Sequence, residues 1–117
     1  MGHIHAVNHM DLGIKAMKFS EYIQYDGLGL AKLVKNKEIH PSELLQVALE
    51  HTHKANPKLN AIIIPMYEQA KQRAQQPLTG TFAGVPFLVK DLFQEYQGVP
   101  TSYGSNALKR INYTPDF

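Results

Sequence analysis

Lys90 is the residue whose type and position most clearly suggest chemistry. It follows the apolar run VPFLV at residues 85–89 and immediately precedes Asp91. A lysine whose ammonium group is drawn into an apolar site has a lowered pKa and can then accept a proton as a general base. The alternative is that Lys90 leaves the end of this segment and reaches solvent, or pairs with Asp91. The local pattern leaves both interpretations open.

Several residues near Lys90 could assist such chemistry. The chain contains no cysteine, so a covalent mechanism would need an oxygen or nitrogen nucleophile. Ser102 and Ser105 lie in a loop-rich stretch after Lys90, but no set of oxyanion donors accompanies a Ser–Lys pair built from them. Asp91 is interpreted as an anion that hydrogen-bonds nearby backbone, with orientation of Lys90 as a further role. Tyr103 is a candidate pocket wall.

The six histidines offer a competing hypothesis, a metal site. Three of them, His3, His5 and His9, lie near the N-terminus, where a His-rich tract is only a compositional hint of metal binding. His51 and His53 are two residues apart and therefore lie on different faces of a helix, whereas a zinc-binding helix uses an i, i+4 pair. The sequence therefore assigns no metal and no other cofactor, and a metal-binding tail remains a weaker alternative.

Most of the elements predicted to position Lys90 are helices. Asp26 is expected to cap a helix with apolar residues at helical spacing, and Pro41 to begin a clearly amphipathic helix with His40 in its N-cap region. Asn56 and Pro57 are expected to end that helix. The other predicted elements are a strand at 59–64, a surface helix at 66–76 and a strand at 85–89, with no recognisable element near the end of the sequence.

This order of helices and strands predicts an α/β fold in which both strands are covered on two faces. Two such strands do not make an independent sheet, since an isolated pair is only marginally stable. We therefore expect residues 18–117 to be the N-terminal portion of a larger domain with a mixed sheet, of which only the first strands are present. Residues 1–17 are expected to form a loose tail, with Met17 as the favoured natural start.

Composition excludes several classes of protein. The chain has 117 residues and a formal charge of +2, with its cations spread along the sequence rather than clustered, which is not typical of nucleic-acid binding. No apolar run approaches the roughly 20 residues of a membrane span, and no secretory signal is recognisable. A cytoplasmic location is therefore the prediction.

Two motifs resemble those of the amidase signature family. Residues 84–91 read GVPFLVKD and residues 98–105 read GVPTSYGS, matching the family's G-V-P-x-x-x-K-D segment and its G-x-P-T-[ST]-x-G-S loop. The stretch from residue 25 to residue 63 is also similar to the opening of that family, so the resemblance covers about residues 19–117. Because the lysine motif continues with Leu92 and Phe93 and the later loop reads TSYGS at residues 101–105, the chain looks like the branch of cyclic-dimer nylon-oligomer hydrolases rather than the tRNA-dependent amidotransferase subunits.

The resemblance implies a hydrolase of carboxylic amides of small molecules, built on a mixed α/β sheet and using a Ser/cis-Ser/Lys triad without a metal or cofactor. Lys90 corresponds to the triad lysine, which would have to be uncharged in the resting enzyme. Both triad serines belong in the family to a Gly- and Ser-rich segment further along the chain, which these 117 residues do not contain. The resemblance therefore assigns one catalytic residue, Lys90, and predicts that these residues alone are inactive.

Two hypotheses of different classes follow. In the first, these residues contribute Lys90 to an amidase site that further residues complete. In the second, the chain is a catalytically inactive remnant that self-associates through exposed strand edges or binds a partner.

Overall fold

The computed structural model describes residues 16–116 and divides the chain into two compact units, Met1–Pro86 and Phe87–Phe117. Most of the predicted N-terminal tail, with the histidines at positions 3, 5 and 9, lies outside the described residues. Lys90 belongs to the second unit, and most of the described helices belong to the first.

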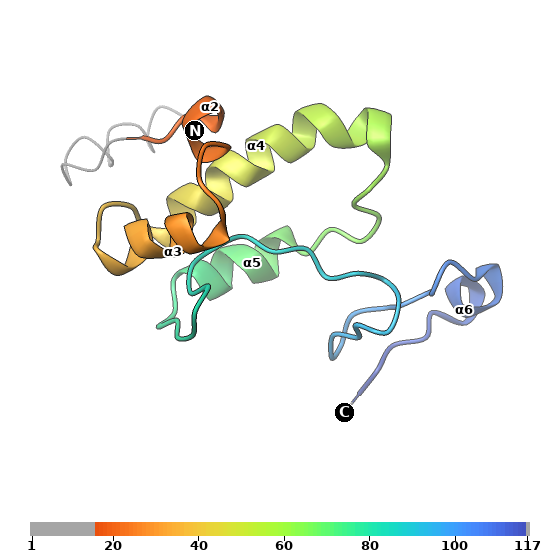
Figure 1. Cartoon of the computed structure of the whole chain (residues 1–117). Helices are drawn as coiled ribbons and strands as arrows, with labels where there is room; N and C mark the ends of the chain where they lie inside the picture. The colour runs from red at the N-terminus through yellow and green to blue at the C-terminus, as the bar shows by residue number, and fades with distance from the viewer. Residues whose placement is uncertain (1–15, 117) are drawn as a thin grey trace. The chain divides into compact units, whose positions relative to one another are not determined.

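Four helices make up the described part of the first unit (Figure 1), and α2 and α5 both contact the long helix α4. The helices are α2 (Phe19–Tyr22), α3 (Gly27–Lys35), α4 (Pro41–Leu59) and α5 (Tyr67–Ala74). Two predicted caps are confirmed. The Asp26 carboxylate accepts a hydrogen bond from the Gly29 N–H at 2.7 Å, and His40 Nδ1 accepts one from the Ser42 N–H at 3.1 Å. These caps satisfy amide groups that a helix leaves unpaired at its start.

The core of this unit lies between α3 and the start of α4. Leu30, Ile39 and Leu44 are buried there, and Leu44 is fully inaccessible. Partly buried apolar side chains pack around them, namely Met17, Tyr22, Leu33, Val34 and Val85. The apolar spacing predicted for the two helices is therefore the spacing that builds the core.

Both histidines of α4 pack against aromatic rings of other helices. The rings of His51 and Phe19 stack with centroids 3.7 Å apart, and His53 meets Tyr67 edge to face at 5.7 Å. Within residues 16–116 no group of three or more His, Cys, Asp or Glu side chains could hold a metal ion. The structure thus gives these two imidazoles packing roles on different sides of α4.

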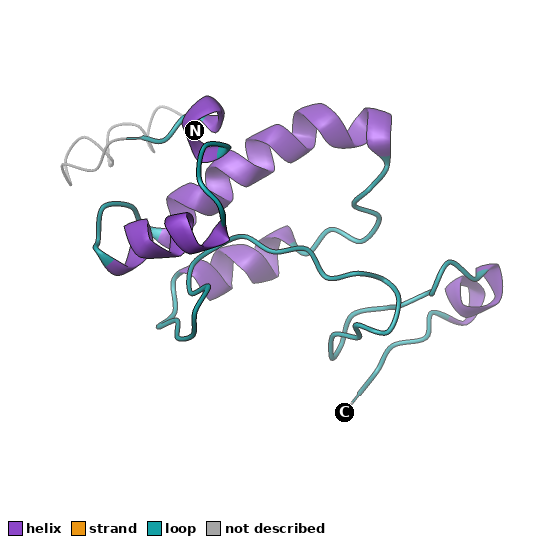
Figure 2. Ribbon diagram, viewed as in Figure 1, coloured by secondary structure: helices purple, strands orange, loops and turns teal. Residues whose placement is uncertain are grey.

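The predicted sheet is wrong for the described residues, because residues 16–116 form helices and loops without any strand (Figure 2). In the 59–64 segment, Leu59 still belongs to α4, and the backbone of Ile62 bonds to a side chain instead of a neighbouring strand. Its N–H donates to Asn56 Oδ1 at 2.9 Å and its carbonyl accepts from Asn56 Nδ2 at 3.0 Å. Residues 85–90 likewise form no strand within the described part of the chain. The Lys90 N–H donates to the Gln94 side chain, and an apolar run needs a paired neighbouring backbone to become a strand.

The predicted end of α4 at Asn56 and Pro57 is also wrong. The helix continues through Pro57 to Leu59 and ends where Asn60 adopts a left-handed conformation, with φ of 48°. Pro57 lacks an amide donor and its ring crowds the preceding turn, yet the helix continues past it, and the Asn60 N–H donates to the Asn56 carbonyl at 2.7 Å. The left-handed Asn60 therefore ends the helix, as is common for this residue type.

The second unit is built from loops around one short helix, α6 (Asn106–Ile111), which the sequence analysis did not predict. Two backbone hydrogen bonds connect its two loop segments. The Gly98 N–H donates to the Pro115 carbonyl at 2.9 Å, and the Thr101 N–H donates to the Tyr113 carbonyl at 3.0 Å. These bonds fix the loop that follows Lys90 against the end of the described chain.

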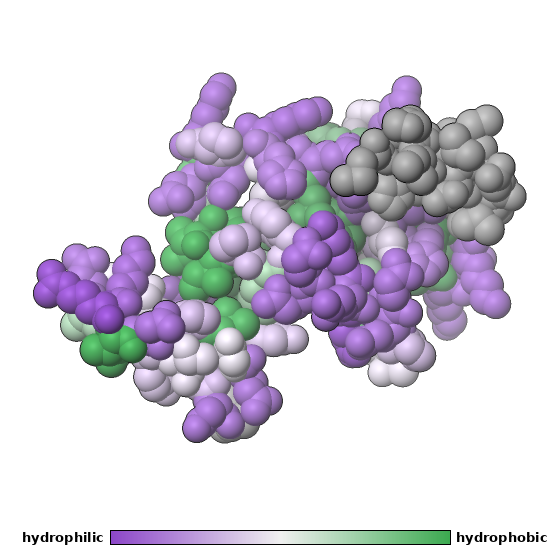
Figure 3. All heavy atoms as spheres, turned by 180° about the vertical axis from the view of Figure 1, so that it is seen from behind, coloured by the Kyte–Doolittle hydropathy of each residue, from purple (hydrophilic) through white to green (hydrophobic). Residues whose placement is uncertain are grey.

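Apolar side chains reach the surface of both units, as the green spheres among the purple ones in Figure 3 illustrate for one face. In the second unit Phe87 is 81% exposed, Leu88 66% and Phe93 85%. Among the described residues no helix is long and apolar enough to cross a membrane.

Candidate active site at Lys90

Lys90 lies at the start of the second unit with its side chain exposed. Its backbone N–H donates to Gln94 Oε1 at 2.9 Å. The sequence left open whether the ammonium group is drawn into an apolar site or reaches solvent. In the described residues, the apolar side chains of Phe87, Leu88 and Val89 are themselves exposed. The structure therefore presents Lys90 at the surface of its unit.

Asp91, the next residue, has the densest set of polar contacts in the second unit. Its carboxylate accepts hydrogen bonds from the Thr101 hydroxyl, from the Ser102 hydroxyl at 2.6 Å, and from the Ser102 N–H at 3.0 and 3.3 Å. We call Asp91, Thr101 and Ser102 the carboxylate clasp. Asp91 was predicted to hydrogen-bond nearby backbone, and that prediction is confirmed.

The clasp favours the ionised form of Asp91. The hydroxyl of Ser102, followed by that of Thr101, lowers the pKa of the carboxyl group, because both donate to the charged form. Partial burial works in the opposite direction, whereas the Ser102 N–H and the charge on Lys109 lower the pKa further. The carboxylate is thus charged at neutral pH, and its hydrogen bonds are charge-assisted.

The two serines considered as partners for Lys90 have other roles. Ser102 is buried and donates its hydroxyl to Asp91, and Ser105 accepts a bond from the Leu108 N–H at 3.5 Å as the N-cap of α6. No hydrogen bond joins either hydroxyl to Lys90 among the described residues. The structure therefore does not bring together the substitute Ser–Lys pair that the sequence left open.

Tyr103, the predicted pocket wall, does line an open hollow together with Phe93, Gln94 and Glu95. Its hydroxyl donates to the Glu95 carboxylate, and its ring lies 5.9 Å from that of Phe93. Phe93 and Tyr103 both adopt left-handed backbone conformations, with φ of 60° and 48°. Such conformations are uncommon for bulky residues. Phe93, Gln94 and Glu95 were not predicted to line a hollow with Tyr103, since nothing in their spacing indicates this contact.

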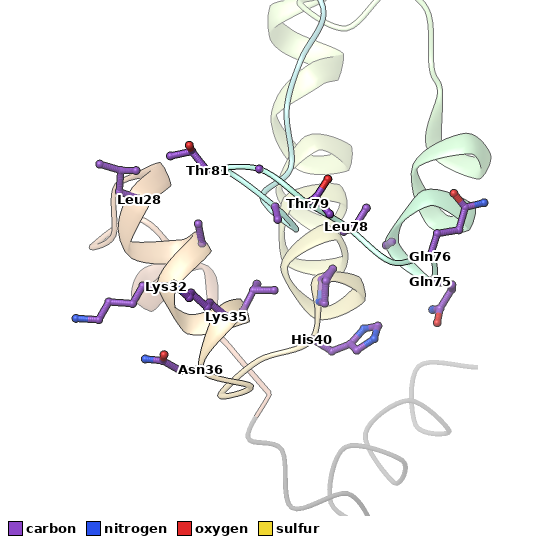
Figure 4. A pocket seen from close by; sticks show the side chains of 16 residues that line it. Leu28, Lys32, Lys35, Asn36, His40, Gln75, Gln76, Leu78, Thr79 and Thr81 are labelled. Atoms are coloured by element: carbon purple, nitrogen blue, oxygen red, sulfur yellow. The ribbon is translucent and has the colours of Figure 1, made fainter.

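A larger hollow lies in the first unit, between α3, the start of α4 and residues 74–83 (Figure 4). Its polar lining includes Lys32, Lys35, Asn36 and His40. In Figure 4 the side chains of Lys32 and Asn36 point away from it. A ligand site needs polar groups that converge, and these two side chains do not converge on the hollow.

Comparison with known proteins identifies the family. The sequence model of the Amidase family matches residues 43–116. The 6-aminohexanoate-cyclic-dimer hydrolase of Paenarthrobacter ureafaciens is 38% identical over 91 residues, which are 78% of this chain and 18% of that protein. The Lipoamidase of Enterococcus faecalis is 37% identical over 92 residues, which are 77% of this chain and 13% of that protein.

The fold agrees with these matches. A solved structure of 6-aminohexanoate cyclic dimer hydrolase aligns with a TM-score of 0.72 at 37% identity, covering 79% of this chain and 19% of that chain. The chain therefore spans about a fifth or less of the length of the relatives it matches, and it has the fold of the corresponding part of that hydrolase. Because the family model matches well over half of these residues, the chain belongs to the amidase family.

Proposed function

We propose that the intact protein hydrolyses carboxylic amide bonds of small molecules and that Lys90 acts as its general base. Membership of the amidase family supports the reaction class, since the relatives are named as amide hydrolases. The observation that carries the role of Lys90 is its place in the K-D pair at the end of the GVPFLVKD segment, directly before the clasped Asp91.

In the proposed reaction, a serine hydroxyl attacks the amide carbonyl and forms an acyl-enzyme. Lys90 accepts the serine proton through a second, bridging serine, and the same proton then passes to the leaving amine. Water next attacks the ester, releasing the carboxylate and restoring the serine. The balance is one amide and one water consumed, with one amine and one carboxylic acid formed. Both serines would come from a part of the protein outside these 117 residues.

The test is a hydrolysis assay on the intact protein with a panel of amides. The panel contains a simple anilide, a lipoyl amide and the cyclic dimer of 6-aminohexanoate, because relatives are named for the last two kinds of compound. Equal amounts of amine and carboxylate should appear for at least one of them. If protein that is folded by circular dichroism releases amine from none of the three amides, the proposed reaction is refuted.

The second candidate is an inactive chain that associates with a second copy of itself through residues 87–93. The exposure of Phe87, Leu88 and Phe93 favours it, since contiguous exposed apolar side chains promote association. Sedimentation velocity over a hundredfold range of concentration should then show oligomers that Phe87→Ser and Leu88→Ser weaken. A monomer at all concentrations would eliminate this candidate. A cytoplasmic location remains a prediction from the sequence.

A further inference from the structure

The carboxylate clasp joins Asp91, which follows Lys90 in the chain, to two buried residues of the second unit, Thr101 and Ser102. Thr101 is 6% exposed and Ser102 is 5% exposed. The Thr101 N–H donates to the Tyr113 carbonyl at 3.0 Å, and the Ser102 carbonyl accepts from the Ser105 N–H at 2.7 Å. Backbone hydrogen bonds to Tyr113 and Ser105 therefore hold the two residues that donate to Asp91.

Lys90 lies between two anchored points of the backbone. On one side, its own N–H donates to Gln94 Oε1 at 2.9 Å. On the other side, the carboxylate of Asp91 accepts three donors from Thr101 and Ser102. The Lys90 side chain is exposed, so its own packing does not fix where the ammonium group is presented. The position of its Cα atom therefore depends on these two anchors.

We propose that Asp91 is a positioning residue for Lys90, because its carboxylate, bound by Thr101 and Ser102, fixes the backbone from which the lysine side chain projects. This inference rests on the proposed function of Lys90 as the base. A base must lie within hydrogen-bond reach of the proton it accepts, and a displacement of about 1 Å can slow a reaction about a hundredfold.

A carboxylate is better suited to this role than a neutral amide. It accepts all three donors, and bonds to a charged acceptor are roughly twice as strong as neutral ones. In Asp91→Asn, one of the two oxygens becomes an NH₂ group that faces donors instead of accepting from them. The variant keeps the size of the side chain but removes its charge and one of its two acceptor oxygens, so it tests the clasp rather than the space it fills.

The kinetic test uses the intact protein and an amide that it hydrolyses. Asp91→Asn and Thr101→Val should each lower kcat about 10- to 100-fold with KM nearly unchanged. Thr101→Ser keeps the hydroxyl and should retain kcat. The matched control is Thr114→Val, which removes a hydroxyl that donates to the Asn112 carbonyl in the same unit. An unchanged kcat in Asp91→Asn, while Lys90→Ala is inactive, would overturn the positioning role alone.

A second measurement does not depend on turnover. In the intact protein, the NMR order parameter of the Lys90 amide should be near 0.85 and should fall below about 0.6 in Asp91→Asn. The Leu30 amide in α3 serves as the internal reference. An unchanged order parameter at Lys90 would overturn the inference whatever the activity. Full activity in Lys90→Ala would instead overturn the proposed function, and with it the positioning role.

Discussion

Gly84 is the position where adding one methyl group should disturb the first unit most specifically. Its φ is +86°, which L side chains rarely adopt, and it lies where the GVPFLVKD segment passes α3 and α4. A Cβ atom built on Gly84 would lie 2.9 Å from Val34 Cγ1 and 3.0 Å from Pro41 Cγ. The change Gly84→Ala therefore combines backbone strain with a steric clash against two fixed side chains.

The variant Gly80→Ala separates the contribution of backbone strain from that of the steric clash. Gly80 also has a positive φ, of +106°, but a Cβ atom there would meet nothing within 4 Å. Strain of about 1–3 kcal/mol is expected in both variants. The gain of about 0.4–1 kcal/mol from a stiffer unfolded chain is also shared. Only Gly84→Ala adds the overpacking term of about 1–3 kcal/mol, and this is the expected difference between them.

Urea denaturation of the 117-residue chain, followed by circular dichroism, measures this difference. The midpoint should fall further in Gly84→Ala than in Gly80→Ala, with the same slope m for both. Equal midpoints would refute the reasoning, since they would mean that Val34 and Pro41 do not confine position 84. A changed slope in Gly84→Ala alone would show that the comparison is not between equally folded states.

Four further outcomes are expected. Leu44→Ala should lower the free energy of unfolding by about 2–5 kcal/mol in the same assay, because Leu44 is fully buried. Asp26→Ala should cost about 0.5–2 kcal/mol by removing the cap of α3, whereas Asp26→Asn should cost little. Asn56→Asp should lower the melting temperature, because it replaces the group that donates to the Ile62 carbonyl with an acceptor. Wild type should be more stable than Asp91→Asn, and this difference should be complete above about pH 4, the ordinary Asp pKa. It should disappear at lower pH, as the carboxyl group is protonated through its lowered folded-state pKa. Urea midpoints measured at several pH values would show this.

The sequence was sufficient where the determining interactions are local. Asp26 and His40 both bind amides within three residues along the chain, so the starts of α3 and α4 could be predicted. Asp91 was correctly expected to accept hydrogen bonds from nearby backbone. The family, too, could be recognised from two short motifs, and the match over residues 43–116 confirms it.

The errors arise where structure depends on distant partners or on one unusual residue. Residues 59–64 and 85–89 have the composition of strands, but a strand needs a neighbouring backbone, and the described residues supply none. Helix α4 continues past Pro57 and ends at the left-handed Asn60, a backbone conformation that the sequence alone does not specify. Helix α6 was missed although Ser105 is a typical N-cap residue, because its six residues are too few to show apolar periodicity.

The most direct test of the role of Lys90 is the kcat of Lys90→Ala in the intact protein, measured on an amide that the wild type hydrolyses. The matched control is Lys71→Ala, which removes an exposed lysine that pairs with Glu68 on α5. We predict loss of at least about a hundredfold in kcat for Lys90→Ala, the lower range for a general base, with folding and the control unaffected. Hydrolysis by Lys90→Ala at the wild-type rate would contradict the account.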